Sequence, residues 1–188
     1  TCGNNHYHIS EITALMENHA PLVEVPTPPP SDKDEIIGKL IAERVRDGAC
    51  IQIGIGSMPN AVARHLADKN DLGVHTEMLC DALVDLFNAG VITGAKKNIN
   101  RNKMVASFAL GSNKLYDYMR SNPFVEIHCS TYINDPYIIG QNDNVVSVNS
   151  TLEVDLTGQC CSESIGKFQY SGPGGQMDFI RGAWRSKG

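Results

Sequence analysis

The stretch of sequence around Glu77 has the residue types that covalent chemistry on a carbonyl compound needs. An apolar run, 72–75, closes on Thr76 and Glu77, and an amphipathic stretch follows at once. A carboxylate at the end of a strand can act as a nucleophile, because α/β proteins bind ligands at the carboxyl ends of parallel strands. The alternative is an ordinary acid in the first turn of a helix that Thr76 caps.

Two glycine-rich turns could supply backbone amides to a ligand. The first is IGIGSMPN, residues 53–60, and the second is SGPGGQMDF, residues 171–179. Glycine lets the backbone approach a ligand closely, and the free amides of a helix N-terminus attract a phosphate or an oxyanion. Each pattern also fits a plain tight turn or a flexible loop. The first turn and Glu77 end consecutive strands, so we expect them on the same rim of a sheet.

The first turn also permits a dinucleotide-binding interpretation. Glu77 falls about 20 residues after Gly56, where an acid that binds ribose lies in such folds. The G-x-G-x-x-G fingerprint is incomplete, however, because Pro59 occupies its third glycine position. A nucleotide-binding module therefore remains an alternative.

The other titratable residues have ordinary structural explanations. His75 and His128 lie in expected strands, where a core or rim histidine is more common than a general base. Asp81 and Asp85 follow Glu77 at a spacing of four and are expected on a solvated helix face. Glu163 is a second candidate acid, but no helix or glycine turn supports it.

Metal and redox sites are not indicated. His6 and His8 would share one face of a strand in HYHISEI, residues 6–12, but no third ligand is suitably spaced, so we expect exposed side chains. The six cysteines form no C-x-x-C pair. Adjacent Cys160 and Cys161 could bridge only with strain. We expect a reducing, cytoplasmic location and no metal.

The elements that must position these residues alternate along the chain. Strands are expected within 50–56, 72–76, 103–110 and 124–130, and helices within 34–48, 58–69, 77–90 and 112–120. Two further strands with a turn between them are expected within 144–158. Alternation of this kind predicts an α/β fold with a largely parallel sheet flanked by helices.

Composition and charge narrow the choice of partner. The 188 residues are 41% hydrophobic, enough for a core, and carry a net charge of −5 with no basic run. This excludes an electrostatic footprint for nucleic acid. No apolar run approaches the ~18 residues of a membrane span. A small molecule or another subunit is the expected partner.

Four prolines in EVPTPPPSDKD, residues 24–34, divide the chain. Proline is excluded from helix and sheet interiors, so this stretch is expected to be a linker. We expect 1–25 to be the tail of an N-terminal domain, 26–34 the linker, and 35–188 a C-terminal catalytic domain truncated at its C-terminus. Because the chain begins on Thr1 and stops at RGAWRSKG, it is expected to be a fragment of a two-domain protein.

Five motifs in order resemble the acetyl-CoA hydrolase/transferase family. They are QIGIGSMPNAV, LGVHTEML, LYDY with a following VE, VSVNSTLEVDLTGQ with a following CSESIG, and SGPGGQMDFIRGA with a following SKG. The resemblance is greatest to the branch with 4-hydroxybutyrate CoA-transferase and butyryl-CoA:acetate CoA-transferase. It implies a class I CoA-transferase-like fold and ping-pong transfer through a glutamyl-CoA thioester.

The resemblance also implies roles for individual residues. Glu77, by its match to H-[ST]-E-[MV], is the nucleophile. Contacts to CoA are implied for the residues Gly54, Ile55, Gly56, Ser57, Met58, Asn149, Leu152, Gly174 and Gly175. The implied partners are an acyl-CoA and a short-chain carboxylate, with CoA as a substrate, no cofactor, and a homodimeric assembly.

Three other functions stay open. A thioester hydrolase of the same family would use the same Glu77 and let water resolve the intermediate. A nucleotide-binding module would place Glu77 on a ribose. An interaction or assembly domain would need no chemistry at all.

Overall fold

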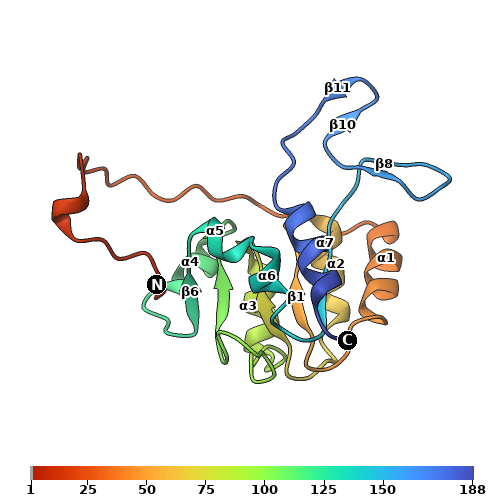
Figure 1. Ribbon diagram of the computed structural model, residues 1–188, viewed down its shortest axis with the longest axis horizontal. Coiled ribbons are helices and arrows are strands. Elements are labelled where there is room, and N and C mark those ends of the chain that lie inside the picture. The colour runs from red at the N-terminus through yellow and green to blue at the C-terminus, as the bar shows by residue number, and fades with distance from the viewer. Residues whose placement is uncertain (1) are drawn as a thin grey trace.

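A five-stranded parallel sheet forms the centre of the computed structural model, which describes residues 2–188 (Figure 1). The strand order is β6-β4-β2-β1-β7. Its strands are β1 Cys50–Gln52, β2 Gly73–His75, β4 Met104–Ala106, β6 Val125–Ile127 and β7 Val145–Ser147. The chain adds β2, β4 and β6 on one side of β1 and then returns to place β7 on the other. The order therefore reverses between β1 and β7, which is where open α/β sheets bind ligands.

Four helices cover the first face of this sheet. They are α1 Asp32–Ala42, α2 Ser57–His65, α3 Asp81–Asn88 and α4 Asn113–Met119. Their buried side chains pack with strand residues into one apolar cluster, which includes Ile51, Val62, Leu66, Val74, Leu83 and Leu115. Parallel sheets need such cover, because both of their faces are apolar or closely packed.

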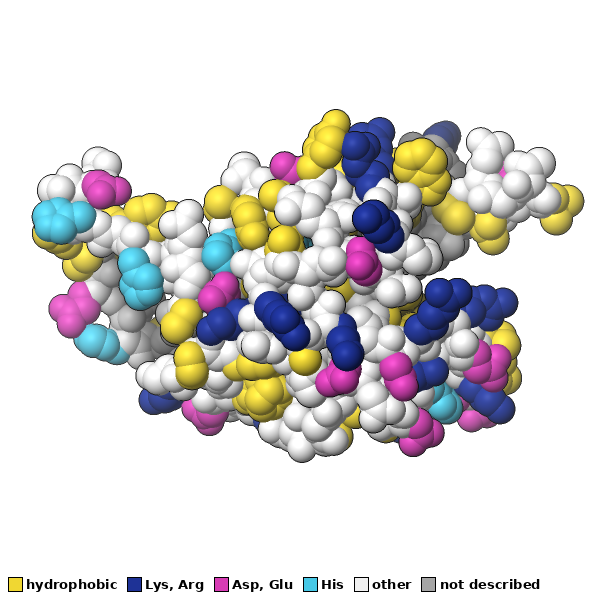
Figure 2. Space-filling model, turned by 60° about the horizontal axis from the view of Figure 1, so that its bottom comes forward, with side chains coloured by type: hydrophobic (Ala, Val, Ile, Leu, Met, Phe, Trp, Pro, Cys, Tyr) yellow, Lys and Arg dark blue, Asp and Glu magenta, His cyan; other side chains and the backbone are white. Residues whose placement is uncertain are grey.

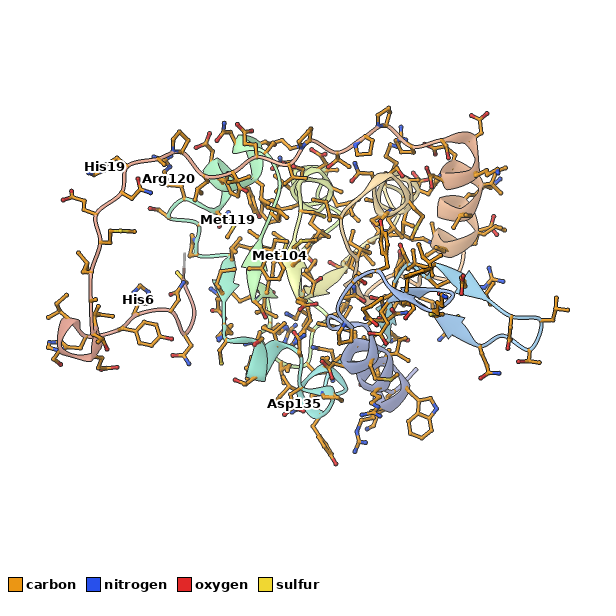
Figure 3. The ribbon with its side chains drawn as sticks, turned by 90° about the horizontal axis from the view of Figure 1, so that it is seen from above. His6, His19, Met104, Met119, Arg120 and Asp135 are labelled. Atoms are coloured by element: carbon orange, nitrogen blue, oxygen red, sulfur yellow. The ribbon has the colours of Figure 1, made fainter. Side chains whose placement is uncertain are left out.

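Three helices cover the second face, on the opposite side in Figure 3, where Asp135 is labelled. They are α5 Ser130–Ile133, α6 Pro136–Ile139 and α7 Gln176–Arg185. Their apolar cluster contains Val105, Ile133, Ile139 and Phe179. Buried polar side chains also occur on this side, from Gln52, His75, Lys97 and Asn142. None of these three helices is predicted from the sequence.

Helix α1 forms where it was expected, with different ends and a different buried side. Ser31 caps it through a reciprocal capping box with Asp34, and it ends at Ala42, well before the C-cap expected at Gly48. Gly38 is buried against α2, where a Cβ would lie 2.7 Å from the Ala61 carbonyl carbon. The small residues thus give close packing, whereas the expected apolar stripe is largely exposed.

Two short parallel strands extend the rim of the sheet. They are β3 Met78–Leu79 and β5 Phe108–Ala109, which pair with each other. The expected single strand 103–110 is therefore two strands, β4 and β5, separated by Ser107.

An arm of two small antiparallel sheets projects from the body after β7 (Figure 1). Its strands are β8 Glu153–Val154, β9 Cys160–Cys161, β10 Ser164–Ile165 and β11 Phe168–Gln169. The expected strand within 151–158 is thus only two residues long. This strand, β8, pairs with β9 in the arm, whereas β7, the other strand expected within 144–158, joins the main sheet.

The N-terminal segment is mostly extended and exposed. The strand expected in HYHISEI is wrong, because the 3-10 helix η1 Ile9–Glu11 forms there, and the His8 side chain accepts from the Ser10 amide. Cys2 pairs with Glu126 at the edge of β6. The boundaries 1–25, 26–34 and 35–188 stay predictions, with α1 starting inside the predicted linker.

Charge of both signs is spread over the surface seen in Figure 2, where Lys and Arg side chains lie among Asp and Glu. Within residues 2–188, no helix combines the length and the apolar character needed to cross a membrane.

Candidate functional site

Glu77 lies at the carboxyl end of β2, between that strand and β3. The interpretation of Glu77 as a helix-start acid is wrong, because α3 begins only at Asp81 and its N-cap is Cys80 rather than Thr76. The helix expected over 77–90 is shortened because Met78 and Leu79 pair with β5 instead. Glu77 therefore has the strand-end position that ligand chemistry requires.

Backbone and hydroxyl hydrogen bonds fix this part of the chain. The amide of buried Thr76 donates to the Val105 carbonyl at 3.1 Å, and its Oγ1 donates to the Ile53 carbonyl at 3.2 Å. The carbonyl of Glu77 accepts from the Ser107 amide at 2.9 Å. Three parts of the chain thus hold the Glu77 backbone, and its half-buried side chain extends over the rim.

The carboxylate of Glu77 lies against Gly175 and Asn134. A Cβ at Gly175 would lie 2.5 Å from Glu77 Oε2 and 2.7 Å from Asn134 Nδ2. Only glycine leaves this space free. Gly175 is the N-cap of α7, and Gly174 before it has a φ of +55°. A carboxylate, a side-chain amide and a helix N-terminus therefore converge on one small volume.

Asn134 was missed by the sequence analysis. It follows α5, and the Asn134 amide donates to the Ser130 carbonyl at 2.8 Å. The only signal in the sequence was its place shortly after the strand 125–127. A hollow of about 420 Å³ opens beside it, lined by Ser130, Thr131, Asn134, Asp135 and Asp178.

The turn after β1 begins next to Glu77, because Ile53 accepts from Thr76. Gly56 is the N-cap of α2 with a φ of +127°, and Pro59 lies in the first turn of the helix, as expected. A Cβ at Gly54 would meet nothing within 4 Å. The turn 54–58 is thus an open backbone surface at a helix N-terminus, suited to an anionic ligand.

Asn149 lies across the β1/β7 switch point from that turn and is held by a polar network. Its Nδ2 donates to Gln52 Oε1 at 3.1 Å and to Ser147 Oγ at 2.8 Å, and Ser147 Oγ donates to Gln52 Oε1 at 2.6 Å. Leu152 is further along, at the base of the arm, where its amide donates to the Cys161 carbonyl at 2.9 Å. The turn 54–58 and Asn149 thus follow the adjacent strands β1 and β7, whereas Leu152 lies in the arm.

Two buried side chains under the rim have strongly altered ionisation. Burial lowers the pKa of His75 to about 4, so this imidazole is neutral at physiological pH. Burial also lowers the pKa of Lys97 to about 8. The Lys97 Nζ donates to the carbonyls of Val74 at 2.9 Å and Lys103 at 3.0 Å.

The remaining candidates lie away from Glu77. Asp81 accepts from the Ser112 amide and hydroxyl, so it is not the solvated acid expected, whereas Asp85 pairs with Lys114 at the surface. Glu163 lies in the arm. Within residues 2–188, no three His, Cys, Asp or Glu side chains form a group that could hold a metal ion. The thiols described are free, including those of Cys160 and Cys161.

Comparisons with known proteins show which family the chain belongs to. Residues 111–188 match the acetyl-CoA hydrolase/transferase C-terminal domain. The whole chain is 51% identical to succinyl-CoA:cyclohexane-1-carboxylate CoA transferase of Geobacter metallireducens and 47% identical to 4-hydroxybutyrate coenzyme A transferase of Clostridium kluyveri. It covers 43% and 44% of these relatives. The chain belongs to the acetyl-CoA hydrolase/transferase family.

Solved structures confirm the fold of this family member. RipA from Yersinia pestis superposes with a TM-score of 0.90 at 46% identity, and the match covers 100% of this chain and 42% of RipA. Relatives named acetyl-CoA hydrolase are more distant, at 32% and 28% identity. The chain spans less than half the length of RipA and of the two CoA-transferase relatives.

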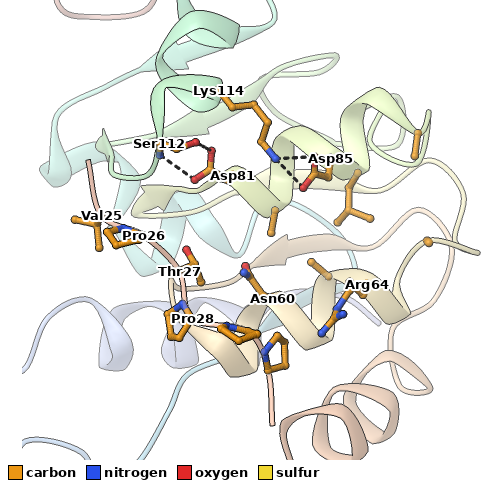
Figure 4. A pocket seen from close by; sticks show the side chains of 17 residues that line it. Val25, Pro26, Thr27, Pro28, Asn60, Arg64, Asp81, Asp85, Ser112 and Lys114 are labelled. Carbon is orange, nitrogen blue, oxygen red and sulfur yellow. Dashed lines mark hydrogen bonds and ion pairs between the residues drawn. The ribbon is translucent and has the colours of Figure 1, made fainter. Parts of the chain in front are cut away.

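A cavity of about 710 Å³ lies away from Glu77, on the first face of the sheet (Figure 4). The segment 25–30 forms one wall, and α2 and α3 form the others. Its charged groups are already paired: Lys114 with Asp85, Arg64 with Glu35, and Asp81 with the Ser112 hydroxyl. Eight of its 17 lining residues are Pro or Ala, and Glu77 is not among them, so the cavity is no part of the rim site.

Proposed function

We propose that the protein carrying this chain is a CoA-transferase that works through a covalent thioester on Glu77. It moves CoA between an acyl-CoA, such as 4-hydroxybutyryl-, butyryl- or acetyl-CoA, and a free carboxylate such as acetate. The family supports the reaction class, and the names of the relatives at 45–51% identity, which refer to succinyl, 4-hydroxybutyrate, butyrate and acetyl-CoA, support the substrate class.

The reaction proceeds by exchange at two carbonyl carbons. A Glu77 carboxylate oxygen attacks the thioester carbonyl of the acyl-CoA and the C–S bond breaks. CoA departs as the thiolate, and the acyl group stays on Glu77 as a mixed anhydride. The thiolate then attacks the Glu77 carbonyl carbon and releases the first carboxylic acid as its anion. The second carboxylate enters by the reverse steps, so no oxidant, reductant or cofactor is consumed. No proton is transferred in these steps, because carboxylate and thiolate anions act in turn as nucleophile and leaving group.

Gly175 and Asn134 have the geometry to stabilise the negative charge that develops in these steps. The Asn134 side-chain NH₂ is a donor at the same small volume as the Glu77 carboxylate, and the Gly175 backbone borders that volume without a side chain to fill it. Donors that are already oriented toward a developing oxyanion lower the barrier by about 3 kcal/mol each.

The rest of CoA is assigned to the rim around Glu77. The open turn 54–58 at the N-terminus of α2 suits its phosphates, and Asn149 and Leu152 flank the chain that leads to the thioester. Binding energy from the distant nucleotide can then hold the reacting ends together. The convergence of Glu77, Gly175 and Asn134 beside the switch point is the single observation that carries this proposal.

The covalent intermediate is tested by intact mass after incubation of the full-length protein with an acyl-CoA, before and after borohydride. We expect a CoA-sized adduct that maps to Glu77 and is absent in Glu77→Gln. Glu163→Gln is the matched control, because it removes a carboxylate from the arm, and it should keep the adduct. An active enzyme without any adduct would contradict the covalent mechanism.

Transfer and hydrolysis are separated by adding the acceptor. A transferase releases the first acid at a rate that rises with acetate and forms acetyl-CoA, whereas a hydrolase releases free CoA without it. Because the transferase-named relatives are more similar than the hydrolase-named ones, we expect transfer.

A homodimer in the cytoplasm completes the proposal, with CoA as substrate and no further cofactor. The assembly follows from the family likeness alone. Light scattering of the purified full-length protein at micromolar concentration measures it directly, and a monomer would contradict it.

A further inference from the structure

His75 is completely buried two residues before Glu77, on the second face of the sheet. Its side chain is 1% exposed. The ring contacts two helices that are far from β2 in the sequence, α5 and α7. These are the helices next to the two groups that meet the Glu77 carboxylate, Asn134 and Gly175.

The contact with α5 is a hydrogen bond to the main chain. His75 Nε2 lies 2.9 Å from the Ile133 carbonyl oxygen. A carbonyl only accepts, so the proton of the neutral ring is on Nε2. Ile133 ends α5 and Asn134 is the next residue, so this bond fixes the peptide group that carries the Asn134 side chain.

The contact with α7 is an aromatic one. The rings of His75 and Phe179 meet edge to face, with centroids 6.2 Å apart and planes at 63°. The amide of Phe179 donates to the Gly175 carbonyl at 3.1 Å in the first turn of α7. The ring contact therefore fixes the turn that places Gly175 against Glu77.

The second ring nitrogen, Nδ1, destabilises the folded state, so packing alone does not explain a histidine at this position. His75 Nδ1 is buried and has no hydrogen-bond partner within residues 2–188. An unsatisfied buried acceptor destabilises the folded state, and an apolar ring of similar size would fill the same space without it. What the histidine supplies and a phenylalanine lacks is the Nε2–H donor to α5.

We propose that His75 is a positioning residue for the reaction at Glu77. Through one hydrogen bond and one ring contact it holds α5 and α7 on β2, so that Asn134 and Gly175 meet the nucleophile at the correct distance. This inference rests on the proposed function of Glu77, but it concerns a residue that never touches the substrate.

Two substitutions separate the contacts of the ring. His75→Phe keeps a ring against Phe179 and removes the donor, and His75→Gln restores an N–H near the position of Nε2. The control is Ile139→Val, which loosens the same apolar cluster without contacting Asn134 or Gly175. Each is made in the full-length protein and assayed for thioester formation on Glu77 in a single turnover, for KM of the acyl-CoA, and for Tm.

We expect His75→Phe to slow thioester formation roughly 10- to 100-fold, because misplacement by about 1 Å is that costly. The KM for acyl-CoA should stay within about twofold, since the CoA-binding turn is untouched. His75→Gln should recover most of the rate, and Ile139→Val should lower Tm without slowing the chemistry. Between pH 6 and 8 the rates of wild type and His75→Phe should keep a constant ratio, because the histidine acts as a fixed neutral donor.

Several outcomes would overturn the inference. One is a His75→Phe rate within about twofold of wild type while the Glu77 adduct still forms, which leaves the proposed function intact. Another is an Ile139→Val rate that falls as far as that of His75→Phe, or a His75→Gln variant that recovers nothing, since either would reduce His75 to ordinary packing. Failure of the proposed function differs, because the wild type itself would then turn over without an adduct.

Discussion

The two faces of the central sheet bury different kinds of side chain. Toward α1–α4 the buried cluster is apolar and joins 24 residues, whereas toward α5–α7 the corresponding cluster has four. The second face compensates with buried polar side chains, from Gln52, His75, Lys97 and Asn142. Apolar burial is non-directional, but buried polar groups must find partners in fixed geometry.

The difference between the faces indicates that they have different roles in stability and in positioning. The first face supplies most of the hydrophobic stabilisation and tolerates variation in detail. The second face supplies directed contacts that place α5 and α7 over the carboxyl rim, where Glu77 lies. Substitutions on the two faces should therefore have different signatures, in stability on the first and in activity or pH dependence on the second.

The largest expected effect belongs to the rim itself. Glu77→Gln should lower kcat of the full-length enzyme by at least about 10³-fold, because loss of a covalent nucleophile removes the step it performs. The free energy of unfolding should change by less than about 0.5 kcal/mol, since the side chain is outside both clusters. Steady-state kinetics and urea unfolding measure the two quantities. A variant with normal kcat would return Glu77 to a structural role.

Gly175→Ala is expected to be the next most severe change in activity. Its new Cβ would lie 2.5 Å from Glu77 Oε2, so the carboxylate or α7 must move. We expect kcat to fall roughly 10- to 100-fold. Gly172→Ala is the matched control in the same loop, because its Cβ meets nothing within 4 Å, and it should retain full activity.

On the first face, Leu83→Ala should reduce stability and leave the chemistry unchanged. Leu83 is 1% exposed, and removing a buried leucine side chain typically costs about 2–5 kcal/mol. Ile36→Ala, at a position 63% exposed, should cost under about 0.5 kcal/mol. Urea unfolding gives both values. A slower reaction per folded Leu83→Ala molecule would break the division between the faces.

On the second face, His75 should make the protein sensitive to acid. Its pKa is about 4 in the folded chain and 6.5 ordinarily, so between these values the unfolded state binds more protons. Stability therefore falls as pH falls through this window, by roughly 3 kcal/mol between pH 7 and pH 4. His75→Phe should lack this component. Equal acid sensitivity of both proteins in denaturant titrations would show that His75 does not cause it.

Lys97 should produce the smallest effect, at alkaline pH. Its pKa is about 8 in the folded chain against 10.5 ordinarily, so above pH 8 the folded state has lost a proton that the unfolded state keeps. Stability should therefore rise with pH, by about 1 kcal/mol between pH 8 and pH 9 relative to Lys97→Met. Parallel unfolding curves at the two pH values measure the difference, and a constant gap between the proteins would contradict it.

Much of the fold could be predicted because its signals are local. Apolar runs at Ile51, Val74 and Val105, separated by helical stretches, are typical of a parallel sheet, and this prediction is confirmed. The start of α3 could not be predicted in the same way. Met78 and Leu79 leave the helix because they pair with β5, a partner 30 residues away in the chain that no local pattern reveals.

Only part of the candidate site could be predicted from the sequence, for the same reason. Glu77 and Gly175 stand in motifs, so their types and neighbours identified them as candidates, and their roles stay predictions. Asn134 has no motif around it, and its place beside Glu77 depends on how α5 and α7 dock. His75 was interpreted as an ordinary core or rim histidine, because an unsatisfied Nδ1 and a contact to Ile133 exist only in three dimensions.

The meeting of Glu77 with Gly175 also has a consequence for the order of folding. These residues are separated by about 100 positions in the chain, so closing the loop between them is slow relative to forming the local β–α units. During synthesis, which adds about 5–20 residues per second, Glu77 emerges several seconds before its glycine. The nascent chain thus carries Glu77 before Gly175 exists, and the proposed nucleophile gains this neighbour only when α7 docks.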